Sequence, residues 1–375
     1  MKLLPLIILA FFIPFQSLFA QIEISGDAVF TFKELDKHSY INTNFRGDDP
    51  FNSVRVRLFG RGAISENVLI LTEFLYDMGA PARINGAYAV ISHIYRDYLN
   101  LKVGMIPSPF GNFALRSTYF NLNPLAGVPL MYHYRSALPI YSTVSNSKLL
   151  KLKEEGYRGL PMAYEACWDT GVEIFGGFHM VNYQIAFTDA SISNPKAYEN
   201  DGRQLIFNLG VNPITGLYTG VSYGRGPYIV PPDSVLTLPE KLENYLQRAY
   251  NFYFEYSHGH LLMWAEFYHN VWDTPLLAEK EIWANSGYFE LRYNFYPGWY
   301  AAARYGFMEF SKISSTDDGN GAKVEWDDGL NRLEVAIAYR FIREAFLRID
   351  LQHNNYADEY LNDVNILAVQ LLLAF

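Results

Sequence analysis

Hydrophobic and polar residues alternate along most of this chain. In residues 54–61, Val54, Val56 and Leu58 alternate with Arg55 and Arg57. The same period of two recurs in residues 99–105, 181–188, 289–295, 333–341 and 347–351. Successive side chains of a β-strand point to opposite faces. Each segment therefore predicts a strand with one apolar face and one face that carries charge, glycine and amide.

Short and long connections alternate between the predicted strands. Tight turns are predicted at 65–67, 95–97, 176–179, 212–216, 257–260, 296–298 and 342–344. Longer polar stretches lie between them, at 33–50, 77–84, 106–165, 189–203, 225–245, 270–285, 310–328 and 353–363. The pattern predicts about sixteen strands, with both chain ends on the side of the short turns. Short turns on one side and long loops on the other are typical of outer-membrane barrels.

The segment 365–375 carries an apolar stripe that runs to Phe375. Leu367, Val369, Leu371 and Leu373 share one face with this phenylalanine if the segment is extended. A last strand of this kind can close against residues 22–32, which leaves no unpaired sheet edge facing lipid. We therefore expect an all-β fold, a transmembrane antiparallel up-and-down β-barrel, with Phe375 in an aromatic girdle beside Tyr296 and Trp299.

The first twenty residues have the pattern of a secretory signal peptide. Lys2 precedes an apolar run from Leu3 to Phe15, and small residues follow near Ala20. This run is short for a membrane-spanning helix, which needs about 20 apolar residues. We expect residues 1–20 to be removed and residues 21–375 to form a single domain. The expected location is the outer membrane of a Gram-negative bacterium.

Composition narrows the function classes. Cys167 is the single cysteine among 375 residues, so no intramolecular disulfide is expected. The net charge of −9 argues against nucleic-acid binding. Ser92 and His93 are adjacent and point to opposite faces of a strand, and His258 and His260 fit a solvated turn. Without a Gly-rich phosphate loop or a zinc motif, we expect neither an enzyme nor a cofactor or metal.

Charge on the predicted inner faces favours a water-filled lumen, because a sixteen-stranded wall is wide enough to enclose a channel. Acidic residues that face inward by parity are Glu255, Glu290, Glu334 and Asp350. The inward basic residues of the predicted pore wall are Arg55, Arg57, Arg61, Arg292, Arg304, Arg332, Arg340 and Arg348. Two interpretations stay open: the arginines form one basic arc that selects anions, or they pair with the acids.

The connection after residue 106 is the longest. Its start, KVGMIPSPFGN (102–112), resembles the phosphate-selective porin families, in which a strand ends in Gly-x-x-x-x-Pro-Phe-Gly. The resemblance implies an outer-membrane porin whose third loop narrows the lumen. The apolar segment 120–134 also favours a loop that packs against the wall. The basic candidates for the constriction are Lys102, Arg116, Arg135, Lys148, Lys151, Lys153 and Arg158.

The basic residues of the third connection do not identify the transported solute. Between residues 106 and 160 there are six basic and two acidic residues, which favours anions. The stretch 148–158 also fits a loop tip that meets lipopolysaccharide phosphates. We expect passive diffusion of small hydrophilic solutes, with or without anion preference. The alternative is a specific channel for sugars or hydrophobic compounds, with Tyr253, Trp264, Tyr268 and Tyr300 as a stacking track.

Further partners follow from resemblance. A terminal Phe375 on an amphipathic last strand resembles the signal that the outer-membrane barrel assembly machinery recognises. Porins also assemble as trimers, so a homotrimer is consistent with the resemblance. Residues 67–79 and 261–272 are too evenly apolar for their faces to be assigned, and such strands occur at subunit interfaces or behind an inserted loop.

Overall fold

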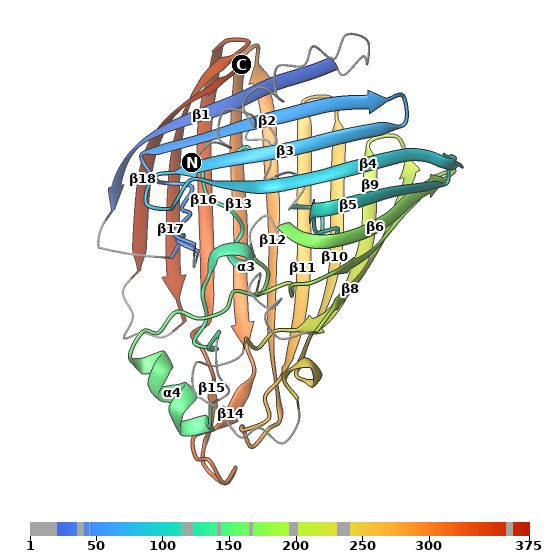
Figure 1. The fold of residues 1–375 in the computed structure, drawn as a ribbon. Coiled ribbons are helices and arrows are strands. Elements are labelled where there is room, and N and C mark those ends of the chain that lie inside the picture. Colours follow the sequence, from blue (N-terminus) through green and yellow to red (C-terminus); the bar gives the residue numbers. More distant parts are fainter. Residues whose placement is uncertain are drawn as a thin grey trace, which may run out of the picture.

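A single closed barrel dominates the molecule (Figure 1). The computed structural model describes residues 21–35, 41–44, 46–113, 116, 123–140, 144–164, 168–194, 202–230, 241–357 and 363–375. The predicted signal peptide 1–20 and Cys167 lie outside these residues. Within the described part, sixteen antiparallel strands form the barrel in chain order, and β1 pairs with β18. The predicted strand number is confirmed.

The strands of the barrel are 8 to 16 residues long. They are β1 (Gln21–Leu35), β2 (Val54–Ser65), β3 (Val68–Asp77), β4 (Arg83–Asp97), β5 (Leu99–Pro107), β6 (Trp168–Phe178), β7 (Val181–Thr188), β8 (Gln204–Ile214), β9 (Leu217–Pro227), β10 (Leu246–His258), β11 (Leu261–Asp273), β12 (Glu281–Tyr296), β13 (Trp299–Phe310), β16 (Leu330–Ile342), β17 (Ala345–Tyr356) and β18 (Val364–Ala374).

The two ends of the barrel differ as predicted. Hairpin turns such as 66–67, 215–216 and 343–344 connect strands at the end where β18 finishes. Longer loops lie at the opposite end, where Figure 1 shows α4 beside the small β14–β15 sheet. The elements within these loops are α3 (Leu130–His133), α4 (Asn146–Glu154), η2 (Leu242–Asn244), β14 (Lys312–Ser314) and β15 (Lys323–Glu325).

The seam between β1 and β18 is a regular antiparallel ladder. Phe30 is opposite Leu371, and Asp27 is opposite Ala374. At the end of the seam, Gly26 N donates to Phe375 O at 2.9 Å and Phe375 N donates to Gly26 O at 3.0 Å. A Cβ at Gly26 would lie 2.6 Å from the phenylalanine ring, so glycine lets the ring lie over β1. The predicted closure of the last strand on the first is confirmed.

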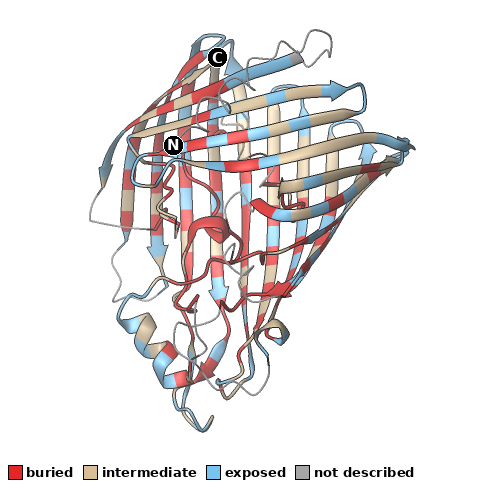
Figure 2. Ribbon diagram, viewed as in Figure 1, coloured by how far each residue is buried: buried red, intermediate tan, exposed pale blue. Residues whose placement is uncertain are grey.

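The outer face of the barrel carries many exposed large apolar side chains. Figure 2 shows buried and exposed positions alternating along the strands. On β16, Leu333, Val335 and Ile337 are exposed on the outside, whereas Arg332 and Glu334 are buried inside. Strand β17 repeats this arrangement. Exposing so many large apolar side chains to water would be costly, and lipid removes that cost. The alternation therefore matches a wall with lipid on one side and polar groups on the other.

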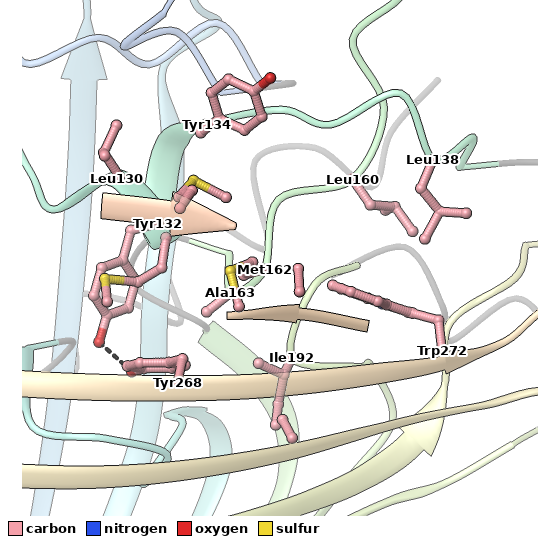
Figure 3. Close-up of a cluster of buried hydrophobic side chains, with 14 of the residues drawn as sticks. Leu130, Tyr132, Tyr134, Leu138, Leu160, Met162, Ala163, Ile192, Tyr268 and Trp272 are labelled. Atoms are coloured by element: carbon pink, nitrogen blue, oxygen red, sulfur yellow. Dashed lines mark hydrogen bonds between the residues drawn. The ribbon is translucent and has the colours of Figure 1, made fainter. Parts of the chain in front are cut away.

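The largest hydrophobic core lies inside the barrel and involves the connection between β5 and β6. We call residues 108–167 the third loop. Figure 3 shows that Leu130, Tyr132 and Met162 of this loop gather beside Tyr268 and Trp272 of β11. The apolar stretch around α3 thus packs on the wall, as its composition predicts.

The structure assigns the faces of the two strands that the sequence left open. On β3, Glu73 and Leu75 are buried inside, and Phe74 is exposed outside. On β11, Trp264 and Tyr268 point inward and are covered. Both faces of β11 are apolar because one meets lipid and the other meets the loop.

Candidate functional site: the third loop and the lumen wall

The third loop leaves the wall through the segment that resembles phosphate-selective porins. Phe110 is buried with its ring centroid 5.3 Å from that of Tyr268, in an edge-to-face arrangement. Gly111 follows with a φ of 74°, a conformation that favours glycine. A Cβ on Gly111 would lie 2.3 Å from the Tyr268 hydroxyl. The Pro-Phe-Gly sequence therefore turns the chain into the lumen and lets it approach β11 closely.

Glu266 of β11 fixes the start of the loop. Its buried carboxylate accepts hydrogen bonds from Asn112 N at 2.5 Å and from Phe113 N at 2.9 Å. The hydroxyl of Tyr132 donates to the same carboxylate at 2.9 Å. Two separate parts of the loop, residues 112–113 and Tyr132, thus donate hydrogen bonds to the same buried carboxylate. Glu266 is not among the residues predicted from the sequence, although Trp264, Glu266 and Tyr268 keep the period of two.

A ladder of charges on β12, β13 and β16 lies under the loop. Arg304 donates to Glu290 at 2.9 Å and to Glu334 at 2.7 Å, and all three side chains are buried. Arg116 of the loop binds Glu290 at 2.5 Å. Burial alone lowers the pKa of Arg116, but the carboxylate of Glu290 outweighs it, so the pKa is raised and this guanidinium stays charged. Paired charges of this kind are stable only as a complete set.

Glycine allows the loop to touch this ladder. Arg304 Nη2 donates to Gly127 O at 2.6 Å. A Cβ on Gly127 would lie 2.0 Å from Glu334 Oε1, so no other residue fits here without displacement. Next to it, Ala126 N donates to Asp350 at 2.9 Å. The loop therefore presents main-chain groups to the charged wall.

Two further arginines of the predicted pore wall hold the loop in the same way. Arg348 donates to Asn123 O at 2.9 Å and also binds Gln370 of β18. Arg332 donates to Val128 O at 3.2 Å and to Asn354 at 2.6 Å. Like Arg304, both are buried. These three arginines face inward as predicted, but the loop covers them and separates them from the open lumen.

The remaining basic residues of β2 and β5 are beside acids. Arg57 binds Asp27 at 2.9 Å, and Lys102 binds Glu173 at 2.8 Å. The nitrogen–oxygen distance to the paired acid is 3.7 Å for Arg55 with Asp77, and 3.5 Å for the exposed Arg61 with Glu23. The structure therefore agrees with paired charges along this part of the wall.

Two arginines line a recess at the turn end of the barrel, which we call the basic mouth. Arg292 and Arg340 flank a cavity of about 620 Å³ with Tyr300 and Asn294. The guanidinium of Arg292 lies 4.3 Å from the centroid of the Tyr300 ring, and its Nε donates to Asn294 at 3.1 Å. The described residues that line this recess include no Asp or Glu.

The other basic candidates of the third loop do not join Arg116. Arg135 donates to Gly159 O at 3.1 Å and also binds the main-chain oxygen of Arg158, so it holds two parts of the loop together. Lys153 binds Asp328 at 2.7 Å. Lys148 and Lys151 lie on the helix α4. Lys148 is exposed, and the Nζ of Lys151 lies 3.6 Å from the Glu155 carboxylate. The structure does not bring the seven predicted constriction residues into one ring.

Helix α4 lies among the long loops. Asn146 donates to Glu279 at 2.8 Å, and Ser147 N donates to Asp317 at 2.8 Å. These contacts place Lys148 and Lys151 at the outer end of the barrel (Figure 1). This position fits the alternative that residues 148–158 form an exposed loop tip.

Asp327, in the loop before β16, holds the third loop from the other side. Its buried carboxylate accepts from Ala137 N at 2.8 Å and from the Tyr134 hydroxyl at 3.1 Å. Burial raises the pKa of Asp327 to about 7, although these donors and Asp328 N act in the opposite direction. Asp327 therefore changes charge near neutral pH.

The predicted stacking track is covered. Tyr253, Trp264, Tyr268 and Tyr300 are all buried, so none presents a free ring to a solute. Among the described residues, no group of three or more His, Cys, Asp or Glu is arranged to hold a metal ion. No described helix is long and apolar enough to cross a membrane.

No family model and no curated protein matches this sequence. Solved structures do match. OmpT, an outer-membrane protein of Vibrio cholerae, aligns with a TM-score of 0.55 at 11% identity, over 96% of this chain and 99% of that chain. Salmonella typhi OmpF, in complex with daunomycin, gives 0.54 at 12% identity over 94% and 97%. The outer-membrane channel DcaP of Acinetobacter baumannii gives 0.53 at 9% identity over 95% and 97%.

The fold is that of an outer-membrane porin. The similarity extends over the whole sixteen-stranded barrel, since 94% of this chain aligns with 97% of the OmpF chain. With its apolar outer surface, the barrel belongs in the outer membrane of a Gram-negative bacterium, as predicted.

Proposed function

We propose that this porin-like barrel lets small hydrophilic solutes cross the outer membrane by passive diffusion. The observation that carries the proposal is the asymmetry of the lumen. The third loop packs on β11 to β18 through Glu266, Arg304 and Asp350, whereas polar recesses lie elsewhere on the inner wall. A loop held in this way narrows a channel without requiring any chemical step.

An anion preference is the finer part of the proposal. Most inward arginines are paired with acids or covered by the loop, so they contribute little net field to the lumen. The basic mouth is different, because two arginines, Arg292 and Arg340, line the same recess. Arginine binds carboxylate and phosphate with two parallel hydrogen bonds. The likeness of residues 102–112 to phosphate-selective porins adds phosphate to the anions that merit testing.

The proposal also covers the partners of the barrel in the membrane, which are further copies of the chain, lipid and the assembly machinery. One solved structure of OmpT is described as a trimer form, and it aligns with this chain at a TM-score of 0.55. We propose a homotrimer surrounded by outer-membrane lipid, with Lys148 and Lys151 of α4 facing lipopolysaccharide phosphates. Phe375 is exposed at the seam, where the barrel assembly machinery can reach it.

The deciding experiment is the reversal potential of the purified protein in a planar bilayer under a potassium chloride gradient. Diffusion through an aqueous lumen predicts ohmic conductance, and the basic mouth predicts a modest shift of the potential toward the chloride sign. A potential of the potassium sign contradicts the anion preference. Absence of conductance contradicts the channel itself.

A further inference from the structure

One sector of the lumen wall carries no inward charge. Strands β7, β8 and β9 contain a single charged residue, Arg225, and it is exposed on the outer face. Apart from Ala186 and Ile206, their inward positions carry amides, hydroxyls and glycines. We call the side chains of Asn182, Gln184, Asn208 and Tyr218 the neutral wall. It contrasts with β12 to β17, whose inward positions carry the paired arginines and acids.

The register of the sheet brings these residues into adjacent rows. Gln184 is opposite Asn208 on the next strand, and Asn208 is opposite Ser222. One row nearer the turns, Asn182 is opposite Gly210. Side chains that are directly opposite lie within about 5.5 Å at their Cβ atoms. The amides therefore lie next to one another and form one polar surface.

The third loop covers one part of this surface, at Asn208 and Ser222. The amide of Asn208 donates to Pro109 O at 2.6 Å, and Gly111 N donates to the Ser222 hydroxyl at 3.1 Å. The loop then turns away toward β11. What remains is a recess of about 430 Å³, which is lined by the neutral wall together with Asn112.

Glycine lets an aromatic ring lie along this recess. A Cβ on Gly210 would lie 2.2 Å from the Tyr218 hydroxyl and 2.6 Å from two of its ring carbons. The ring therefore crosses above Gly210 instead of projecting into the lumen. Tyr218 is half-buried, and its hydroxyl accepts from Tyr253 at 3.2 Å. A ring held along a wall in this way offers a flat apolar surface beside polar groups.

Hydrogen-bonding capacity remains in the amides around this ring. Asn182 is exposed, and its side chain makes no hydrogen bond with any described residue. Gln184 donates to Glu173 at 3.1 Å and keeps its carbonyl oxygen for another partner. An amide can both donate and accept, which matches the two roles of a hydroxyl group.

The acids near the recess lie on other strands, and one of them has a cation as its partner. Glu173 is bound by Lys102 at 2.8 Å, and Glu255 accepts from Asn112 at 3.0 Å. Asp97, at the rim of the recess, is exposed to solvent. The inward side chains of β7 to β9 add no charge of their own, and they offer an uncharged solute donors, acceptors and a ring.

We propose that the neutral wall is a binding subsite for uncharged polyhydroxylated solutes, that is, for sugars. The amides of Asn182 and Gln184 exchange hydrogen bonds with neighbouring hydroxyls, and the C–H face of the sugar lies on Tyr218. The inference rests on the proposed diffusion function and names the class of solute that is retained during passage.

The test is the ion current through the purified full-length channel in a planar bilayer, measured while sucrose is added. A polyethylene glycol of equal hydrodynamic radius is the control for simple exclusion of ions by volume. We expect sucrose to reduce the current saturably and more than the polymer does. Asn182→Ala and Tyr218→Ala should each weaken the apparent affinity about fivefold to tenfold, as expected for one lost contact.

Asn355→Ala is the matched control, because Asn355 lies on β17 and binds Asp363 at the loop end. It should leave the sucrose block unchanged. Because Asn182 is exposed, Asn182→Ala keeps the test valid even if Tyr218→Ala fails to fold. Equal block by sucrose and polymer, or unchanged affinity in Asn182→Ala, overturns the subsite while leaving the channel intact. A protein that conducts no ions overturns the proposed diffusion function instead.

Discussion

Arg304 on the barrel wall donates a 2.6 Å hydrogen bond to the main-chain oxygen of Gly127, which lies in the third loop 177 residues earlier in the chain. The same guanidinium neutralises Glu290 and Glu334. One side chain thus satisfies two buried acids and anchors the loop. The stability of the loop and the charge balance of the wall are therefore coupled through this contact.

Removing Arg304 should be severely destabilising. Arg304→Met leaves the buried Glu334 without its cation and leaves Glu290 with Arg116 alone, and the expected loss in unfolding free energy is about 3–5 kcal/mol. Urea unfolding in detergent measures it. Arg61→Met is the control, since Arg61 and Glu23 are both exposed and such a pair contributes about 0–1 kcal/mol. Equal losses in the two variants would contradict the buried network.

A side chain at position 127 should displace the loop. In Gly127→Val, the new Cβ would lie 2.0 Å from Glu334 Oε1, so either the loop or the acid must move. Overpacking of this kind costs about 1–3 kcal/mol. We expect a lower thermal midpoint and a higher single-channel conductance. Gly62→Ala is the control, because a Cβ there has nothing within 4 Å; its conductance should equal that of the wild type.

The stability that Asp327 contributes should fall as pH rises, because ionising this buried carboxyl costs desolvation. Burial raises the pKa of this carboxyl from 3.8 to about 7, so the folded protein holds the proton more tightly than the unfolded chain does. This stabilising contribution is complete below about pH 4 and is lost as pH rises through about 7. Asp327→Asn stays neutral and should lack that dependence. Thermal midpoints between pH 4 and 8 test this; identical slopes for both proteins would refute it.

Ion selectivity should respond to the basic mouth and not to the outer loop. Arg292→Glu with Arg340→Glu should move the reversal potential toward the potassium sign, because the recess then attracts cations. Lys148→Glu with Lys151→Glu makes the same change of charge on the exposed helix α4, far from the lumen (Figure 1). We expect no shift from the second pair. A shift of equal size from both pairs would mean that selectivity is set outside the barrel.

Much of the fold follows from local sequence. Period two in segments such as 333–341 predicts a strand whatever its neighbours are, and short turns at 296–298 and 342–344 predict antiparallel pairing. The closure by residues 365–375 is also predictable, because an apolar stripe facing lipid must belong to a sheet without edges. These features depend on residues that are close in the sequence or on the solvent alone.

The candidate site was less predictable because its contacts are distant in the sequence. Parity correctly turns Arg304 and Arg348 inward, but it does not reveal that Gly127 and Asn123 cover them. Glu266 was missed because its neighbours Trp264 and Tyr268 are apolar enough to hide the alternation. The neutral wall left a visible signal, since β7 and β8 contain no charged residue at all.

The separation between the charged wall under the loop and the neutral wall has an evolutionary consequence. Residues that hold the protein together, such as Glu290 and Arg304, are grouped on one side, and exchange of any one of them endangers the rest. Asn182 and Tyr218 lie on the other side and, being uncharged, belong to no network of ion pairs. During evolution, substitutions on β7 to β9 should therefore be tolerated more readily than substitutions in the charged wall. Such substitutions can change which solutes bind while the barrel keeps its architecture.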